Sequence, residues 1–448
     1  MKKTVSALCA ALSSICLAAP TLTIDAIDQN PDSRLVSITY TISGEPAVVT
    51  LDAIAAGGQT VDDSMLVDVQ GDVNKLIPVG SGHRLYWKPD DSVKGADYAS
   101  ATFSVTAWAT NAPPDYMVID LLNSTTERVY YYTSTNRFPV PLSDESYRTT
   151  KLVMRRIPAA GVTFRMGSPT DEAGRQTSTN YEATHYVTFN EDFYLGIYPV
   201  TRRQHNLLTG KNASNYFVNY NEGLDWPHTG GQLCALRTWI IESGGTATHK
   251  YWPRDGHELD YDSSHENNGN HLYFMRQRFP GFMFDLPTEA QWEFACRGGA
   301  TTYEARYGNI DEIAWTANNS ISDTYNVYLP HPVGQLKPNG YGLYDMLGNV
   351  WEKMLDGWET MPNDETVRVD PPGPDVGIVR DTKYVMRGGS FACDPKYARA
   401  ANRSYTAINN LTDGNCVSTN NATINNGSVT GNQYGFGYRL WLPAHAVK

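Results

Sequence analysis

The stretch LPTEAQWEFACRGG, residues 286–299, contains a complete set of signals for a short helix. Thr288 is suited to be the N-cap, and Gln291, three residues later, completes a capping box by reaching back to the N-cap amide. The Gly-Gly pair at 298–299 ends the helix, because glycine accepts the left-handed backbone that closes many helices. The tryptophan and phenylalanine between these signals supply packing surface. The stretch therefore predicts scaffold rather than chemistry.

Cys296 lies near the end of this predicted helix, directly after Phe294 and Ala295. An apolar helix face predicts that the Cys296 thiol is buried. Burial in apolar surroundings raises the pKa of a thiol and slows its reactions, so we expect Cys296 to be structural rather than reactive.

Five further blocks lie on either side of the helix. They are IPAAGVTFRMGSP (157–169), HYVTFNEDFYLGIYPVT (185–201), KPNGYGLYDMLGNVWE (337–352), RGGS (387–390) and GFGYRL (435–440). In order and spacing, the six blocks resemble the formylglycine-generating enzyme family, also called sulfatase-modifying factors. The resemblance implies an α+β domain like a C-type lectin, with a small twisted sheet, long loops and little regular secondary structure.

The resemblance also implies an activity and a copper site. The family oxidises a cysteine of a sulfatase to formylglycine, using O₂ and a copper ion held by two cysteines five residues apart. By position, RGGSFAC places Cys393 on the first of these cysteines and Ser390 on a serine that lines the family's active site. Thiolates are soft ligands that suit Cu(I). Ala398 stands where the second cysteine is expected, so the implied copper site is incomplete.

Two more residues depart from the family pattern near this position. Asp394 stands where a histidine often follows the first cysteine, and Lys353 replaces the second tryptophan of the usual WEW. Departures that cluster at the site, in a chain that keeps the scaffold blocks, indicate a retained fold with altered or lost chemistry.

The block GLYDMLGNVWE carries the family's position for a structural calcium ion. Carried over by position, the ligands are the Asn349 side chain, the backbone carbonyls of Gly348 and Val350, and the Glu352 carboxylate. Amide, carbonyl and carboxylate oxygens are the hard ligands that Ca²⁺ prefers. The alternative is a turn in which Asn349 has a left-handed backbone and Glu352 is merely exposed.

Residues 1–18 predict a secretory signal peptide, with a basic start, an apolar stretch and cleavage after Ala18. We therefore expect an exported protein, either periplasmic, at the cell surface or secreted. No later stretch is long and apolar enough to predict a membrane-spanning helix. Export would place four cysteines in an oxidising compartment, with three pairings open if all are oxidised: Cys234, Cys296, Cys393 and Cys416.

Residues 19–112 predict a small β-sandwich of the immunoglobulin or fibronectin type. Short stretches such as 36–42 alternate apolar and polar residues, which is typical of half-buried strands. The paired prolines at 113–114 disfavour both helix and central strand and predict a boundary. We expect the formylglycine-generating-enzyme-like domain over residues 116–448.

The formal net charge of -12, without a basic cluster, argues against binding of nucleic acid. The partner implied by the family is a protein substrate such as a sulfatase. The alternative function is non-catalytic binding of a protein or glycan through the lectin-like fold and the Asn-rich stretch 402–432. That arrangement resembles the variable proteins of diversity-generating retroelements. The four histidines within 249–271 match no zinc-ligand spacing, and we expect a solvated loop there.

Overall fold

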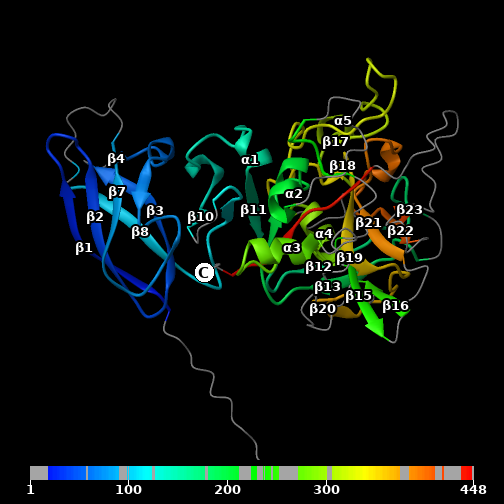
Figure 1. Ribbon diagram of the computed structural model, residues 1–448, viewed down its shortest axis with the longest axis horizontal. Coiled ribbons are helices and arrows are strands. Elements are labelled where there is room, and N and C mark those ends of the chain that lie inside the picture. The colour runs from blue at the N-terminus through cyan, green and yellow to red at the C-terminus, as the bar shows by residue number, and fades with distance from the viewer. Residues whose placement is uncertain are drawn as a thin grey trace, which may run out of the picture. The chain divides into compact units, whose positions relative to one another are not determined.

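The protein was analysed as a computed structural model (Figure 1). It describes residues 19–56, 59–89, 98, 100–123, 127–176, 180–210, 223–229, 236, 238–243, 246–251, 271–299, 305–373, 383–408, 416–417 and 435–445. The predicted signal peptide, residues 1–18, lies outside this set, as do most of the His-rich and Asn-rich segments. Within these ranges, no helix is long and apolar enough to cross a membrane.

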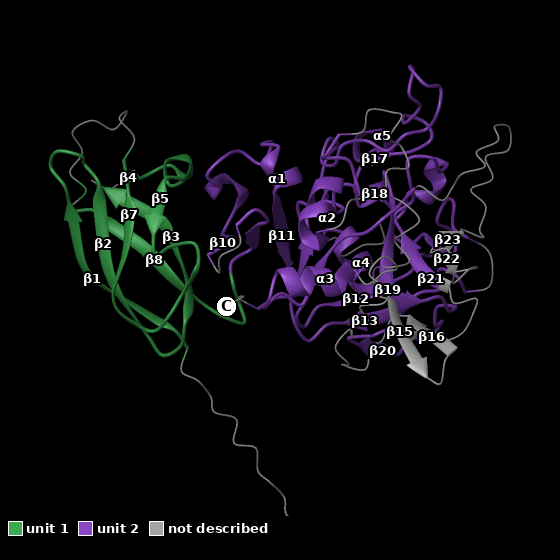
Figure 2. Cartoon of the chain, in the orientation of Figure 1, with its two compact units in different colours: residues 1–113 green, residues 114–448 purple. Residues whose placement is uncertain are grey.

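The chain divides into two compact units, residues 1–113 and 114–448 (Figure 2). The first unit consists of two antiparallel sheets that share one hydrophobic core. One sheet has the order β1-β2-β7-β5, from β1 (Thr21–Gln29), β2 (Val36–Ser43), β7 (Gly80–Trp87) and β5 (Val69–Gly71). The other contains β4 (Gln59–Thr60), β3 (Ala47–Ala56), β6 (Leu76–Ile77) and β8 (Thr102–Ala109), which pairs with β3. The 3-10 turn η1 (Asp63–Met65) follows β4.

The alternation predicted for β2 is confirmed. The apolar residues Val36, Ile38, Tyr40 and Ile42 are buried, while the residues between them are only half-buried. Alternation of this kind follows from the period of two in a strand, which sends successive side chains to opposite faces.

The second unit contains an antiparallel sheet in the order β10-β9-β11-β14-β25. Its strands are β9 (Tyr116–Asp120), β10 (Val129–Tyr132), β11 (Lys151–Ile157), β14 (Phe193–Gly196) and β25 (Trp441–Pro443). A smaller sheet joins β12 (Thr163–Met166), β13 (His185–Thr188) and β20 (Val367–Val369). Because β25 pairs with β14, the last described strand packs beside segments from the start of the unit.

A second five-stranded sheet, in the order β23-β22-β21-β19-β24, carries the candidate site. Its strands are β19 (Trp351–Gly357), β21 (Lys383–Arg387), β22 (Arg403–Ile408), β23 (Cys416–Val417) and β24 (Phe436–Gly437). Two strand pairs complete the unit: β15 (Thr238–Ser243) with β16 (Thr246–Tyr251), and β17 (Ala314–Trp315) with β18 (Leu347–Gly348). Short strands joined by long connections, with few helices, confirm the expected α+β fold with little regular structure.

The helices of the second unit are short. They are α1 (Ser146–Thr149), α2 (Arg202–Thr209), α3 (His271–Arg278), α4 (Glu289–Cys296) and α5 (Ile310–Ile313), with 3-10 turns η3 (Thr135–Arg137) and η7 (Pro395–Tyr397). The capping box predicted for α4 is confirmed: the Thr288 hydroxyl accepts from the Gln291 amide at 3.2 Å, and the Gln291 side chain accepts from the Thr288 amide at 2.9 Å. Both Gly298 and Gly299 have positive φ and follow the end of the helix, as predicted.

Helix α4 is embedded in the main hydrophobic core of the second unit. Trp292, Ala295 and Cys296 are fully buried there. Burial raises the pKa of the Cys296 thiol far above its ordinary value. The prediction that Cys296 is buried is confirmed, and its environment disfavours the reactive thiolate.

Candidate functional site

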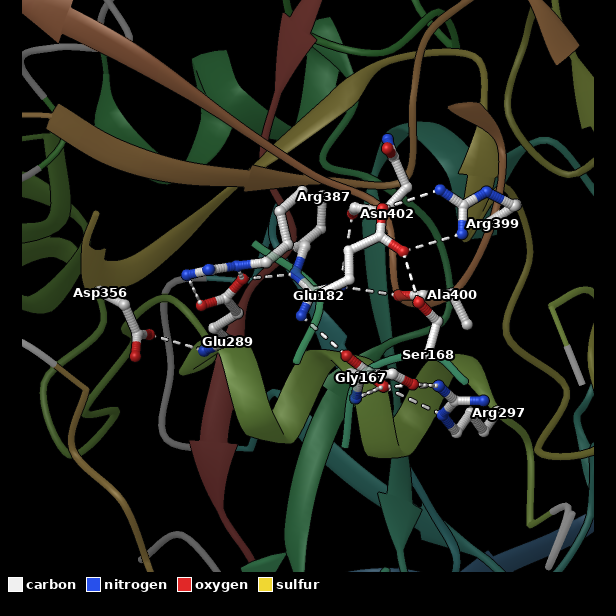
Figure 3. Close-up of polar contacts among 12 residues, drawn as sticks. Gly167, Ser168, Glu182, Glu289, Arg297, Asp356, Arg387, Arg399, Ala400 and Asn402 are labelled. Carbon is white, nitrogen blue, oxygen red and sulfur yellow. Dashed lines mark hydrogen bonds and ion pairs between the residues drawn. The ribbon is translucent and has the colours of Figure 1, made fainter. Parts of the chain in front are cut away.

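The α4 network is a set of buried ion pairs between helix α4 and the strands that face it. Glu289 projects from α4 toward Arg387 at the end of β21 (Figure 3). Glu293 of the same helix pairs with the same arginine. Arg387 Nε donates to Glu289 Oε1 at 2.7 Å, and its Nη2 donates to Glu293 Oε2 at 2.8 Å. Burial alone would raise the pKa of both carboxyls, but the adjacent guanidinium groups outweigh it and hold each pKa below its usual value. The pairs therefore remain ionised in the core.

Two further arginines complete the α4 network. Arg403 on β22 donates to Glu289 Oε2 at 2.8 Å, and Arg297 donates to Glu293 Oε1 at 2.6 Å. Arg297 also donates to the carbonyl of Gly167 at 2.7 Å, and the amide of Gly167 donates to Glu293. Because every charge has a hydrogen-bonded partner, the large cost of removing it from water is offset. The network fixes α4 against β21, β22 and the turn after β12.

The segment after η7 is held by a separate pair. Arg399 donates to both carboxylate oxygens of Glu182, at 2.8 and 2.9 Å, and Ser168 donates to the same carboxylate at 2.7 Å (Figure 3). Arg399 also pairs with Glu172. A bidentate arginine–carboxylate pair restricts orientation as well as distance. It therefore fixes the backbone next to Ala398, the residue that stands at the second copper position.

The Cys393 corner consists of Cys393, Ser390 and Trp351. The Ser390 hydroxyl lies 3.2 Å from Cys393 Sγ, and Trp351 contributes a hydrogen bond to the same thiol. Cys393 is 2% exposed. Burial raises the pKa of Cys393, and the hydrogen bonds from Ser390 and Trp351 only partly counteract this rise. The structure thus brings the two predicted site residues together around a thiol that is mostly protonated at neutral pH.

The residues of the Cys393 corner do not fit a copper ion. Ala398 is buried at the end of η7 and offers only a methyl group. Within the described ranges, no group of three His, Cys, Asp or Glu residues is arranged to hold a metal. Cys296, the other described free cysteine, lies on α4. Cu(I) prefers soft thiolate ligands, and a serine hydroxyl beside one protonated thiol is a poor substitute.

Glu352, a predicted calcium ligand, has other partners in the structure. It is fully buried, and Arg439 donates to Oε1 at 2.7 Å and to Oε2 at 3.1 Å. Trp292 Nε1 also donates to Oε2 at 2.8 Å. Neither interpretation of the sequence foresaw this role, because the alternative to a calcium ligand was an exposed carboxylate.

Asn349 adopts the left-handed backbone expected for a turn, with φ of 56°. Its side-chain oxygen accepts from the amide of His331 at 3.1 Å, and its carbonyl accepts from the amide of Phe391 at 2.8 Å. Of the four predicted calcium ligands, the Glu352 carboxylate is thus paired with Arg439 and the Asn349 side-chain oxygen with the His331 amide. Calcium at this block remains a prediction.

Arg387 and Arg439 were missed as site residues by sequence reasoning, although both lie inside the recognised blocks. Arg387 begins RGGS and Arg439 belongs to GFGYRL. An arginine within an otherwise apolar or glycine-rich block is a usable signal, because arginine is rarely buried without a carboxylate partner. The partners, Glu289 and Glu352, also lie within the quoted blocks.

Comparisons with known proteins agree with this architecture. A family model described as "Sulfatase-modifying factor enzyme 1-like domain" matches residues 145–413, which is more than half of the chain. A formylglycine-generating enzyme of Thermomonospora curvata is 40% identical over 126 residues, which cover 25% of this chain and 40% of the enzyme. The chain thus spans less than half of that enzyme's length.

Two other similar proteins have different names. A protein of Paenibacillus barcinonensis named "Chaperone protein LppX" is 30% identical over 236 residues, covering 48% of this chain and 80% of that protein. The solved structure of Treponema denticola variable protein 1 is 22% identical with a TM-score of 0.42, covering 66% of this chain and 96% of that one. With more than half of its residues matched by the family model, the chain belongs to the family of sulfatase-modifying factor enzyme 1-like domains.

Proposed function

We propose that this protein is an exported, non-catalytic member of its family, which uses the scaffold to bind a protein partner. The observation that carries the proposal is that Ala398, and not a second cysteine, stands five residues after Cys393. Cu(I) needs soft, deprotonated ligands, and this corner supplies one buried thiol whose pKa is raised by burial. The family's copper-dependent oxidation therefore lacks its metal site here.

The choice of a protein partner, rather than a glycan, is supported by the Paenibacillus relative. That relative is named a chaperone, and this chain covers four-fifths of its length. A chaperone acts on another polypeptide without changing its covalent structure. We extend this kind of role, binding without chemistry, to the present chain. The expected export rests on residues 1–18, whose composition predicts a signal peptide.

A second candidate is oxidation of a sulfatase cysteine, favoured by relatives named formylglycine-generating enzymes. The experiment that separates the two is incubation of the purified chain with Cu(I), O₂ and a cysteine-containing sulfatase-motif peptide. Mass spectrometry then detects formation of the aldehyde. We expect no aldehyde from the wild type, whereas conversion at a rate like that of a formylglycine-generating enzyme would refute the proposal.

The matched variant is Ala398→Cys, which restores the second sulfur at the family position. Aldehyde formation by this variant alone would show that the missing thiol is the only barrier to catalysis. Binding is measured separately, by anisotropy of a labelled, permanently unfolded protein such as reduced and carboxymethylated lactalbumin. Saturable binding that is equal for wild type and Cys393→Ser supports a binding role independent of the thiol. No binding by either protein would contradict a chaperone-like role.

A further inference from the structure

Three imidazole rings form a buried cluster in the second unit, which we call the histidine cluster: His205, His228 and His271. His205 lies on α2, His228 follows the bridge between Thr201 and Pro227, and His271 begins α3. The rings of His205 and His228 stack with centroids 3.8 Å apart and planes inclined by 15°. The ring of His271 meets His205 edge-on at 4.7 Å. All three residues are buried.

Hydrogen bonding of the cluster is incomplete. His205 Nδ1 lies 2.8 Å from the Tyr438 hydroxyl. His205 Nε2 and both ring nitrogens of His228 have no hydrogen-bonding partner among the described residues. Burying a neutral imidazole with an unbonded ring nitrogen costs a moderate free energy. An imidazolium has two donors and a positive charge, and this site would leave them unpaired.

The charges around the cluster also oppose protonation. Among the described residues, a cation, Arg202, acts on His228, and each ring lies close to another imidazole. Tyr438 is buried and its pKa is raised, so it supplies no anion. Neither His205 nor His228 forms an ion pair with a carboxylate in the described part of the chain. Burial, reinforced by His271 and Arg202, lowers the pKa of His228 to about 3, and burial lowers the pKa of His205 as well.

The cluster joins segments that are distant in sequence. The amide of His228 donates to the carbonyl of Val200 at 2.8 Å, and the amide of Val200 donates to the carbonyl of Tyr438 at 2.9 Å. Separation of the rings would therefore loosen α2, α3, residues 227–229 and the end of β24 together. The rings of His205 and His228 are stacked and nearly parallel, so their nitrogens do not point to one centre. No group of three His, Cys, Asp or Glu residues in the described part of the chain is arranged to hold a metal, and we treat the cluster as a packing contact.

We propose that the histidine cluster is an acid-sensitive lock, which holds α2 and α3 in place only while its imidazoles are neutral. An unfolded histidine has a pKa near 6.5. Because the folded pKa is lower, the cluster's contribution to stability is complete above about pH 6.5 and declines as the pH falls below it. Below pH 6.5, each histidine with a lowered folded pKa increases the equilibrium constant for opening by about tenfold for every unit by which the pH falls.

Hydrogen exchange of the full chain, read by mass spectrometry at pH 7.5 and pH 5.5, tests the lock. After correction for intrinsic exchange rates, the opening constants of peptides from α2 and α3 should rise roughly a hundredfold, from two histidines. Peptides from α4, which contains no histidine, serve as the internal control. If α2 and α3 change no more than α4 does, the proposal is wrong.

The matched variants are His228→Phe, which keeps an aromatic ring without a titrating group, and His445→Phe as a control at a half-exposed position. His228→Phe should reduce the rise in α2 and α3 to about tenfold, and His445→Phe should leave it unchanged. An equal rise in all three proteins would overturn the assignment to the cluster. If His228→Phe does not fold, the wild-type comparison of α2 and α3 with α4 still decides.

Discussion

One member of the α4 network, Arg387, lies close in sequence to the Cys393 corner, yet the two are built in different ways. Arg387 and Cys393 are six residues apart. Arg387 is joined to two carboxylates and to the carbonyl of Ala400, all of them buried. Among the described residues, the side chains that hydrogen-bond to Cys393 are those of Ser390 and Trp351, and both are uncharged. Loss of Arg387 would leave Glu289 with Arg403 alone and Glu293 with Arg297 alone as its arginine partner, whereas loss of a thiol removes no charge from the core.

This difference explains how a chain can keep the scaffold of an enzyme family without its metal site. Removing one member of a buried ion pair is strongly destabilising, so the residues of the α4 network depend on one another. A cysteine in a copper site is required for chemistry, but its replacement by alanine leaves a small buried side chain. Ala398 packs in the main core of the unit. The fold therefore needs the residues of the α4 network, whereas only copper-dependent catalysis needs the second thiol.

The largest effect that follows from this comparison is on stability. Arg387→Met should lower the free energy of unfolding of the second unit by about 3 to 5 kcal/mol, because Glu289 and Glu293 each lose a partner. Urea unfolding at pH 7 measures this decrease in the free energy of unfolding. The control is Lys337→Met, which removes a mostly exposed pair with Glu312 and should cost less than about 1 kcal/mol. Similar losses of unfolding free energy in Arg387→Met and Lys337→Met would contradict the special importance of the buried α4 network.

An intermediate effect separates the two roles considered for Glu352. If its carboxylate stabilises the fold through Arg439, Glu352→Gln should cost about 2 to 4 kcal/mol whether or not calcium is present. The wild-type melting temperature should also be unaffected by a chelator. If calcium binds at this block, the chelator lowers the melting temperature of the wild type and has no effect on Glu352→Gln. That result would restore the calcium assignment.

How far the sequence could predict these features depends on the range of the interactions. The capping box of α4, the strand of residues 36–42 and burial of Cys296 follow from neighbouring residues, and all three were predicted correctly. The pairing of Glu352 with Arg439 joins residues 87 positions apart. Sequence spacing does not reveal such a contact. The histidine cluster escaped prediction for the same reason, since α2, residues 227–229 and α3 meet only in the folded chain. The expected solvated loop was wrong at His271, which is buried at the start of α3.

The smallest effect concerns thiol reactivity. In the folded wild type, both Cys296 and Cys393 should react slowly with iodoacetamide at pH 7, because burial raises the pKa of each thiol and restricts access. Mass spectrometry of peptides identifies the labelled cysteine. Cys416, in a polar stretch of the sequence, should react first if it is reduced. Rapid labelling of Cys393 would show that the Cys393 corner is accessible and would weaken the contrast with the α4 network.

Cu(I) affinity shows whether the scaffold persists without the copper site. Competition with a coloured Cu(I) chelator is measured for the wild type, Cys393→Ser and Ala398→Cys. We expect wild type and Cys393→Ser to release Cu(I) to the chelator equally, and Ala398→Cys to retain stoichiometric Cu(I) through two thiolates. Tight, stoichiometric binding by the wild type that is lost in Cys393→Ser would contradict this expectation.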